Sequence, residues 1–546
     1  MQRKDLLKLL KPCLQDELAE VAGRLLDPVA AHLREAGCTR LFDRPPAFVF
    51  DPVAASSYLP EPIALPRAVD VKPLSPSARH ADQCDPEWCD PADLGERIRS
   101  GSLNRREVLE RFAGRINQWN PVVNAFACIT LDHDHPGNGT GELSGVPVGV
   151  QDMICTRGVP TAAGSRILEG FIPDGDAAAW KRLSGVGAVL AGKLTTQEFA
   201  AGTTGENDWF GPTRNPWNPS RHAGGAAGGA GAAVAAGLVS AAIATDPGGS
   251  LRVPAAHCGV VGLKPTFGAI DRSGSIPLTW TTEALGPLAR TVLGAAQISD
   301  LLLDGRSLER YGQSCTSAAL SGSRMPKVPL QVGVPSGWLA MGLDAGVQGA
   351  FEAALDLLKS LGAEIVDIDL PDLTSMAPVH RAIAFSEASS IHEEFILTRA
   401  GEYGDTIRDR QEAGRGMLAS EYLKAWRLRG EFARRFSEAW RRADVMITPT
   451  SPVPAAPLGT LKVSTGSRGL EALHSVYTRY AAPTSSMGLP SLSVPCGFTG
   501  DGLPVGLQFS GPPHSEPLLF HVAASYEATA QWVDRHPAHP DEHIQR

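Results

Sequence analysis

The chain contains no uninterrupted hydrophobic run long enough to cross a membrane, which takes about 18 residues or more. Its longest apolar tract is rich in small alanine and glycine residues and is broken by Asp246 and Pro247. The N-terminal segment MQRKDLLKLLKPCLQDELAE lacks the continuous apolar core of a secretory signal. We therefore expect no membrane contact and a cytoplasmic location.

Cysteine is also scarce, with 9 residues scattered through a chain of 546. An odd number without regular spacing excludes a disulfide framework and is typical of a reducing compartment. The net charge of -9 offers no attraction to nucleic acid or to an anionic membrane. Hydrophobic residues make up 43% and charged residues 20% of the chain, which is the composition of a globular protein.

Patterns that hold metals or phosphates are missing too. The tract Asp132-His133-Asp134-His135 lies in a short polar linker and is interpreted as a solvated loop. Cys84 and Cys89, with His80, are too loosely spaced and one ligand short for a zinc site. The glycine tract at 224–231 lacks the lysine and the Ser/Thr of a phosphate-binding loop. We expect no metal and no other cofactor.

Two regions of different character divide the chain. Residues 4–36 carry apolar positions at helical spacing and predict amphipathic helices, whereas 45–91 carries ten prolines and predicts an extended strap. From 90 onward the pattern predicts two helices that end at Asn120-Pro121, followed by a strand. We therefore divide the chain into an extension, 1–89, and a main domain, 90–546.

Within the main domain, short buried-strand patterns alternate with helical ones. This alternation predicts an α/β fold: a mixed, mostly parallel β-sheet covered by helices on both faces. Residues 384–442 form a long, charged, helical region with interruptions near 401–404 and 414–416. The predicted strands are 146–150, 187–193, 330–336 and 363–371, with a helix over 347–360.

The stretch 221–268 is dominated by glycine and alanine and holds Ser250 at its most crowded point. Glycine at this density indicates positive φ or a close approach by another backbone or a ligand. The residues DPGGS followed by LRVPA predict a tight loop that opens a short helix. Ser250 is therefore a candidate nucleophile.

These residues resemble the amidase signature family of serine hydrolases and amidotransferase subunits. The similarity rests on GVPVGVQD, GGAAGGAGAAVAAG, TDPGGSLRVPAAHCGVVGLKPT and the closing GLPSLSVPCGFTGDGLPVGLQFSG, and it runs from about Asp90 to about Asp534. In that family 384–442 corresponds to the variable region that shapes the substrate pocket. The extension 1–89 is interpreted either as a fused segment similar to the small accessory component of amidotransferases or as an unrelated leader.

The resemblance implies a relay of three side chains: a serine nucleophile, a second serine that follows a cis peptide bond, and a lysine that accepts the proton. Matching the motifs places the nucleophile at Ser250. The bridging serine falls on Ala226, beside Ala227, and the lysine falls on Gln151. One of the three members is therefore retained.

Both replacements remove proton transfer. Gln151 cannot titrate near neutral pH, and Ala226 has no hydroxyl group. Loss of residues that act as a unit typically removes about 10⁴ to 10⁶ in rate. The resemblance also places the oxyanion hole at residues 247–250, where Pro247 has no N–H, while Gly248, Gly249 and Ser250 keep theirs.

Other residues near these motifs carry two interpretations each. His222 and His257 are either replacement bases or, respectively, a surface loop residue and a packed helix residue. Arg252 is either a carboxylate clamp or the partner of Asp246 that holds the loop. Thr203 and Thr204 resemble the family loop that lines the pocket.

Two functional hypotheses follow. In the first, the chain is a pseudoenzyme that binds a carboxamide or carboxylate ligand or serves as the silent member of a complex with a protein partner. In the second, it is an enzyme with altered acyl-transfer, condensation or cyclisation chemistry that uses Ser250 or the residual oxyanion hole. The identity of the ligand and the oligomeric state have no readable signal in the sequence.

Overall fold

The computed structural model describes residues 84–131, 141–303, 305–322, 329–466, 469–530 and 532–540. The predicted N-terminal helices, most of the proline-rich segment and the Asp132–His135 tract lie outside these ranges. Within them, no helix combines the length and apolarity that crossing a membrane would require. The same ranges hold no group of three or more His, Cys, Asp or Glu side chains arranged for a metal ion.

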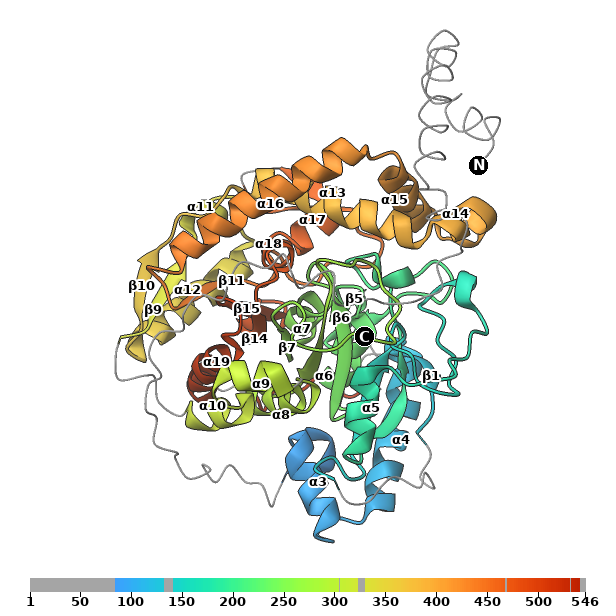
Figure 1. The fold of residues 1–546 in the computed structure, drawn as a ribbon. Helices are drawn as coiled ribbons and strands as arrows, with labels where there is room; N and C mark the ends of the chain where they lie inside the picture. Colours follow the sequence, from blue (N-terminus) through green and yellow to red (C-terminus); the bar gives the residue numbers. More distant parts are fainter. Residues whose placement is uncertain are drawn as a thin grey trace. The chain divides into compact units, whose positions relative to one another are not determined.

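An eleven-stranded sheet runs through the described domain (Figure 1). Parallel pairs join β3–β2–β6 on one side and β11–β9–β10 on the other, and the strands between them pair antiparallel. The strands, in their order across the sheet, are β1 (Phe126–Ile129), β3 (Val189–Leu194), β2 (Pro147–Gln151), β6 (Ala241–Asp246), β8 (Ala284–Ala289), β7 (Val261–Lys264), β14 (Ser491–Phe498), β15 (Pro504–Ser510), β11 (Val445–Pro449), β9 (Gln331–Val334) and β10 (Glu364–Asp367).

Two short hairpins lie outside this sheet, β4 (Arg214–Asn215) with β5 (Asn218–His222) and β12 (Lys462–Ser464) with β13 (Leu470–Ala472). The α-helices that the site and the core use are α3 (Pro91–Arg99), α4 (Arg105–Val123), α5 (Ala178–Gly185), α6 (Gly228–Ala235), α7 (Arg252–Cys258), α8 (Val292–Leu302), α9 (Gly305–Tyr311), α10 (Cys315–Ser321), α11 (Ser336–Leu339), α12 (Ala345–Ser360), α13 (Leu373–Ile391), α14 (Glu393–Arg399), α15 (Asp405–Arg415), α16 (Ala419–Ala439), α17 (Leu473–Tyr477), α18 (Ala481–Ser486) and α19 (Glu516–Ala530).

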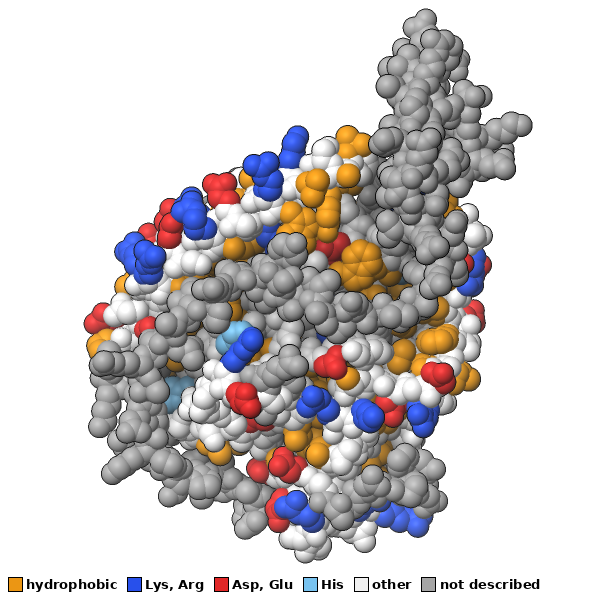
Figure 2. All heavy atoms as spheres, viewed as in Figure 1, with side chains coloured by type: hydrophobic (Ala, Val, Ile, Leu, Met, Phe, Trp, Pro, Cys, Tyr) orange, Lys and Arg blue, Asp and Glu red, His pale blue; other side chains and the backbone are white. Residues whose placement is uncertain are grey.

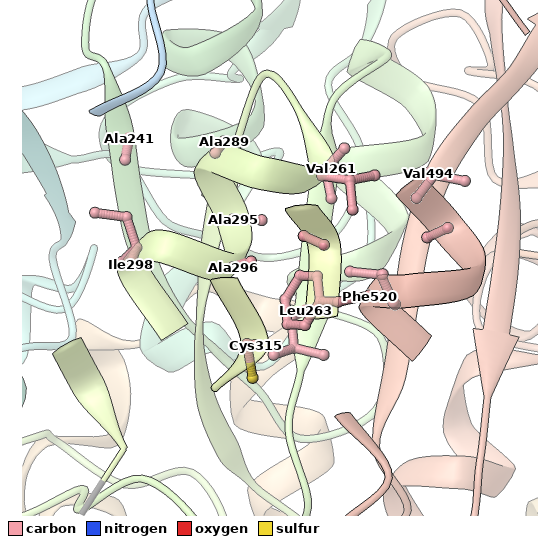
Figure 3. Packing of buried hydrophobic residues seen from close by; sticks show 14 of the residues in the cluster. Ala241, Val261, Leu263, Ala289, Ala295, Ala296, Ile298, Cys315, Val494 and Phe520 are labelled. Carbon is pink, nitrogen blue, oxygen red and sulfur yellow. The ribbon is translucent and has the colours of Figure 1, made fainter. Parts of the chain in front are cut away.

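Side chains alternate between the two faces of the sheet, and each face has its own apolar core. On β6, Ala241 and Ile243 belong to the cluster formed with α8, α10 and α19, whereas Ala242 and Ala244 belong to the cluster formed with α6 and α7. Figure 3 shows Ala241 and the first of these clusters, in which residues of α8 and α19 lie against β7 and β14. The predicted mixed sheet with helices on both faces is thus confirmed; among the described residues, six of its ten strand pairings are antiparallel and four are parallel.

Most predicted elements occur with ends shifted by one to three residues. The helix expected to stop at Asn120-Pro121 continues to Val123, because Pro121 sits in the last turn, where few backbone hydrogen bonds remain to be lost. Asn124 then ends the helix in the left-handed region, with φ of 51°.

The helices α13 to α16 occupy the predicted variable region and its flank (Figure 1). The interruptions fall where the glycines predict them, since α14 ends at Arg399 and α15 ends at Arg415. The helical region begins at Leu373, however, eleven residues before the predicted start at 384. Basic and acidic side chains lie close together on the outer surface along α16 (Figure 2), where Arg434 pairs with Glu438.

Candidate functional site

The turn that carries Ser250 is built on the carboxyl end of β6, a central strand of the sheet. Asp246 ends this strand, and its carboxylate accepts the N–H of Gly249 at 2.5 Å. Gly249 has φ of 116°, and a Cβ there would lie 2.8 Å from the Cβ of Ala481. Glycine is therefore required by conformation and by space, and the turn leads directly into α7.

Arg252 stabilises the same turn through hydrogen bonds of its guanidinium group. Its Nε donates to Asp246 at 2.9 Å, and its other nitrogens donate to Thr484, Gln508, Ser485 and the Ala481 carbonyl. Both members of the ion pair are fully buried. Desolvation alone would raise the pKa of Asp246, but the Arg252 guanidinium outweighs it and the net shift is downward. Arg252 thus pairs with Asp246, as one of its two interpretations predicts.

A second turn, at residues 224–227, packs directly against the Ser250 turn. The Ala227 N–H donates to the Ser250 carbonyl at 3.1 Å, and the Gly225 N–H donates to the Thr203 carbonyl at 2.7 Å. A Cβ on Gly225 would lie 2.5 Å from the backbone carbonyl oxygen of Ser250. Ala226 is completely buried between these contacts, and the peptide bonds of the described residues, including the one before Ala226, are trans.

Gln151 lies at the end of β2, next to β6, and its side chain is fully buried. Its amide nitrogen donates to the Thr196 hydroxyl at 2.9 Å, and its amide oxygen accepts the Thr245 N–H at 2.7 Å. The carboxamide thus bonds to Thr245 on β6 and to Thr196 just beyond the end of β3. It occupies the position that the resemblance assigns to the base, and it has no titratable proton in the neutral range.

A buried lysine does lie on the neighbouring strand, at Lys193, opposite Val150 of β2. Its amine donates to Thr161 at 2.8 Å and to the Ile154 carbonyl, and Asp152 lies 4.0 Å away. Desolvation lowers the pKa of Lys193 to about 8 and raises the pKa of Asp152 to about 6. Lys193 is not among the residues that line the cavity over Ser250.

A cavity of about 400 Å³ opens over the Ser250 turn. Pro247, Gly248, Ser250 and Thr203 are the sequence candidates that line it. The candidates Gln151, Ala226, Gly249, Arg252, Thr204, His222 and His257 are not among its lining residues. The rest of the wall comes mainly from α13, α15, α17 and α18, so elements far apart in sequence enclose the site.

Two of the residues that line this cavity have backbone N–H groups without a partner in the described ranges. Among the described residues, the N–H groups of Gly248 and Ser250 donate to no other group. Gly249 gives its N–H to Asp246, and Pro247 has none to give. At the positions predicted for an oxyanion hole, two N–H groups are therefore free of a hydrogen-bond partner within the described part of the chain.

The two histidines considered as replacement bases lie within the packed framework. Nε2 of His222 lies 3.3 Å from Glu206, and Nδ1 faces the Tyr477 hydroxyl at 3.4 Å. His257 packs edge-on against Tyr477, and burial lowers its pKa to about 3. Neither ring lines the cavity. His257 is a packed residue of α7, as its second interpretation predicts, whereas the surface-loop interpretation of His222 is wrong because this residue ends β5 and is fully buried.

The cavity wall holds functional side chains that the sequence did not single out: His380, Arg381, Arg410, Gln411 and His474. His380 comes closest to the serine turn, since a Cβ added to Gly248 would lie 2.9 Å from its Nε2. Its Nδ1 lies 2.6 Å from the Ser486 hydroxyl. Arg410 and Gln411 fall inside the predicted pocket-shaping region, whereas His380 and Arg381 precede it and carry no motif.

Comparison with known proteins identifies the family of this chain. The family model described as Amidase matches residues 107–520. This chain belongs to the amidase signature family. It is 34% identical over 484 residues to a glutamyl-tRNA(Gln) amidotransferase subunit from Chloroflexus aurantiacus, covering 81% of this chain and 96% of the relative.

Solved structures agree with this assignment. The glutamyl-tRNA(Gln) amidotransferase subunit from Thermotoga maritima superposes with a TM-score of 0.68 at 30% identity, covering 82% of this chain and 96% of that one. A 6-aminohexanoate cyclic dimer hydrolase complexed with substrate superposes with a TM-score of 0.75 at 26% identity, covering 83% and 99%. The predicted family is confirmed, and of the signature stretches the turn at Pro247, Gly248 and Ser250 lines the cavity.

Proposed function

We propose that this amidase signature chain binds a small carboxamide or carboxylate over Ser250 and does not hydrolyse ordinary amides. The observation that carries the proposal is Gln151: at the lysine position stands a neutral amide, buried and hydrogen-bonded to Thr196 and Thr245. Ala226 adds to this, because no hydroxyl can pass a proton from Ser250. The free N–H groups of Gly248 and Ser250 supply donors for a bound oxygen.

The relatives add a proposal about partners. Those from Chloroflexus and Thermotoga are named as subunits of an amidotransferase, so we propose that this chain also associates with another protein. The net charge of -9 still argues against a nucleic-acid partner. The absence of a titratable relay favours a binding or structural role in such a complex.

Reversion of the relay tests this proposal. We expect the wild-type chain to hydrolyse simple amides no faster than Ser250→Ala does. The double variant Gln151→Lys with Ala226→Ser should gain at least about 100-fold, because a positioned base contributes roughly 10² to 10⁴. Gln151→Met with Ala226→Ser is the matched control, with a side chain of similar length and no amine. Wild-type hydrolysis that depends on Ser250 would contradict the proposal.

A second candidate function rests on His380. Its ring lies beside the Gly248 turn and is positioned through Nδ1 by Ser486. Desolvation, followed by the field of Arg429 and Arg381, lowers its pKa to about 4, so the ring is neutral at pH 7 and is a weak base. In this candidate, His380 assists acyl transfer from Ser250.

Labelling of Ser250 by a fluorophosphonate, followed by intact mass, distinguishes the two functions. Altered chemistry requires rapid labelling that His380→Gln slows and His222→Gln, a buried histidine outside the cavity, leaves unchanged. The binding function requires little labelling in all three proteins. Equal, rapid labelling of the wild type and His380→Gln would exclude His380 as the base.

A further inference from the structure

Two arginines on neighbouring helices face the cavity over Ser250. Arg381 comes from α13 and Arg410 from α15, which pack against each other. Arg410 donates to the Ala201 carbonyl. Within the described part of the chain, Arg381 makes neither an ion pair nor a hydrogen bond, although it lies in a cavity wall and not on an open surface.

The positive charge of this wall has no compensating carboxylate available. Among the described lining residues, Glu471 is the one acidic side chain, and Arg479 already holds it at 2.7 Å. A guanidinium that serves the fold normally has its donors satisfied, as those of Arg252 are. Arg381 therefore keeps its donors available to a ligand in the cavity.

Neutral polar groups in the same wall also lack partners. The hydroxyl of Thr203 and the side-chain oxygen of Gln411 are buried without a hydrogen bond, and Gln411 is only 1% exposed. The free N–H groups of Gly248 and Ser250 add two donors at the serine end. Because the Thr203 and Gln411 oxygens are closed off from the cavity, the groups open to a ligand at the serine end are the two N–H donors, which suit the carbonyl oxygen of an amide or a urea.

We propose that Arg381 anchors a carboxylate, so that the ligand is a small acid that also carries an amide or ureido group. The carboxylate pairs with the Arg381 guanidinium, whose planar fork suits two parallel N–H···O bonds. The amide end lies toward Gly248 and Ser250. This inference rests on the proposed ligand-binding function and specifies its ligand class.

Calorimetric titration of the full-length chain tests the proposal with two matched series. One consists of succinamate, glutaramate and adipamate, each with one carboxylate and one amide. The other consists of the neutral diamides of the same lengths. We expect the best acid amide to bind the wild type at least about tenfold more tightly than its diamide, the scale of one charge-assisted pair.

Arg381→Gln should abolish this preference while leaving diamide affinity within about twofold, and Arg381→Lys should retain part of it. Arg427→Gln, an exposed arginine on α16, controls for the change in overall charge and should leave the preference intact. Arg381 has no partner in the fold, so its loss should leave the thermal unfolding of the apo protein unchanged or raise its midpoint.

The outcomes separate this inference from the function beneath it. If wild type binds diamides and acid amides equally, or Arg381→Gln keeps the preference, the carboxylate site is refuted and the ligand-binding function stands. If wild type binds neither series, the ligand-binding function and the carboxylate site both fail. A preference that disappears in Arg381→Gln alone supports both.

Discussion

Replacing Asp246 with asparagine should destabilise the fold strongly, because the pair it forms with Arg252 supports the whole Ser250 turn. Both side chains are fully buried, and their direct contact is 2.9 Å. Asparagine keeps one acceptor, but it turns an NH₂ group toward either the Arg252 guanidinium or the Gly249 N–H. The substitution therefore leaves a buried cation uncompensated and sets two donors against each other.

Breaking a buried pair by removing one partner costs about 3 to 5 kcal/mol. The matched control is Asp501→Asn, since Asp501 pairs with Arg221 at 3.3 Å while remaining 69% exposed. That pair should contribute only about 0 to 1 kcal/mol. Urea unfolding of the wild type and both variants at neutral pH measures the two differences.

The pH dependence supplies a further check. Because the folded pKa of Asp246 lies below its ordinary value, its stabilisation is present above about pH 4 and is lost as the pH falls through the folded pKa. Wild type and Asp246→Asn should therefore converge in stability in acid. A cost below about 1 kcal/mol for Asp246→Asn at neutral pH would refute the assigned role of the buried pair.

Three further predictions concern the same region. Burial lowers the folded pKa of His257 to about 3, so its neutral form stabilises the fold above pH 6.5 and that stability is lost on acidification. His257→Gln should lose about 2 kcal/mol less than wild type between neutral pH and about pH 5, measured by urea unfolding. Equal losses would contradict this. Gly225→Ala should destabilise by more than about 1 kcal/mol, because φ is 58° and its Cβ would meet Pro254 at 2.4 Å. The control, Gly430→Ala in exposed α16, should stabilise by about 0.5 to 1 kcal/mol, and equal thermal shifts would refute the steric argument. Thr203→Val should leave the melting temperature of the apo protein unchanged or raised, because the buried Thr203 hydroxyl has no partner in the fold; a lowered melting temperature would contradict this.

Local patterns in the sequence were sufficient to predict the strands β1, β2, β3, β9 and β10, the helices α3, α4 and α12, and the Ser250 turn. Alternation of apolar residues and the positions of glycine and proline act over a few residues, so they are readable without tertiary contacts. Helix ends were less predictable: α4 runs through Pro121, and α13 starts at Leu373, before the expected region.

The sequence by itself determined the family and what stands at each motif position: Ser250 where a nucleophile is expected, with Gln151 and Ala226 in place of the other relay members. Only the tertiary structure decided what surrounds the serine. Helices α13, α15 and α17 bring Arg381, Arg410 and His474 into one wall, although no motif links them. The tertiary structure also shows that the Gly249 N–H and the Arg252 guanidinium both donate to the Asp246 carboxylate. Partners of this kind depend on distances across the fold, which spacing along the chain does not encode.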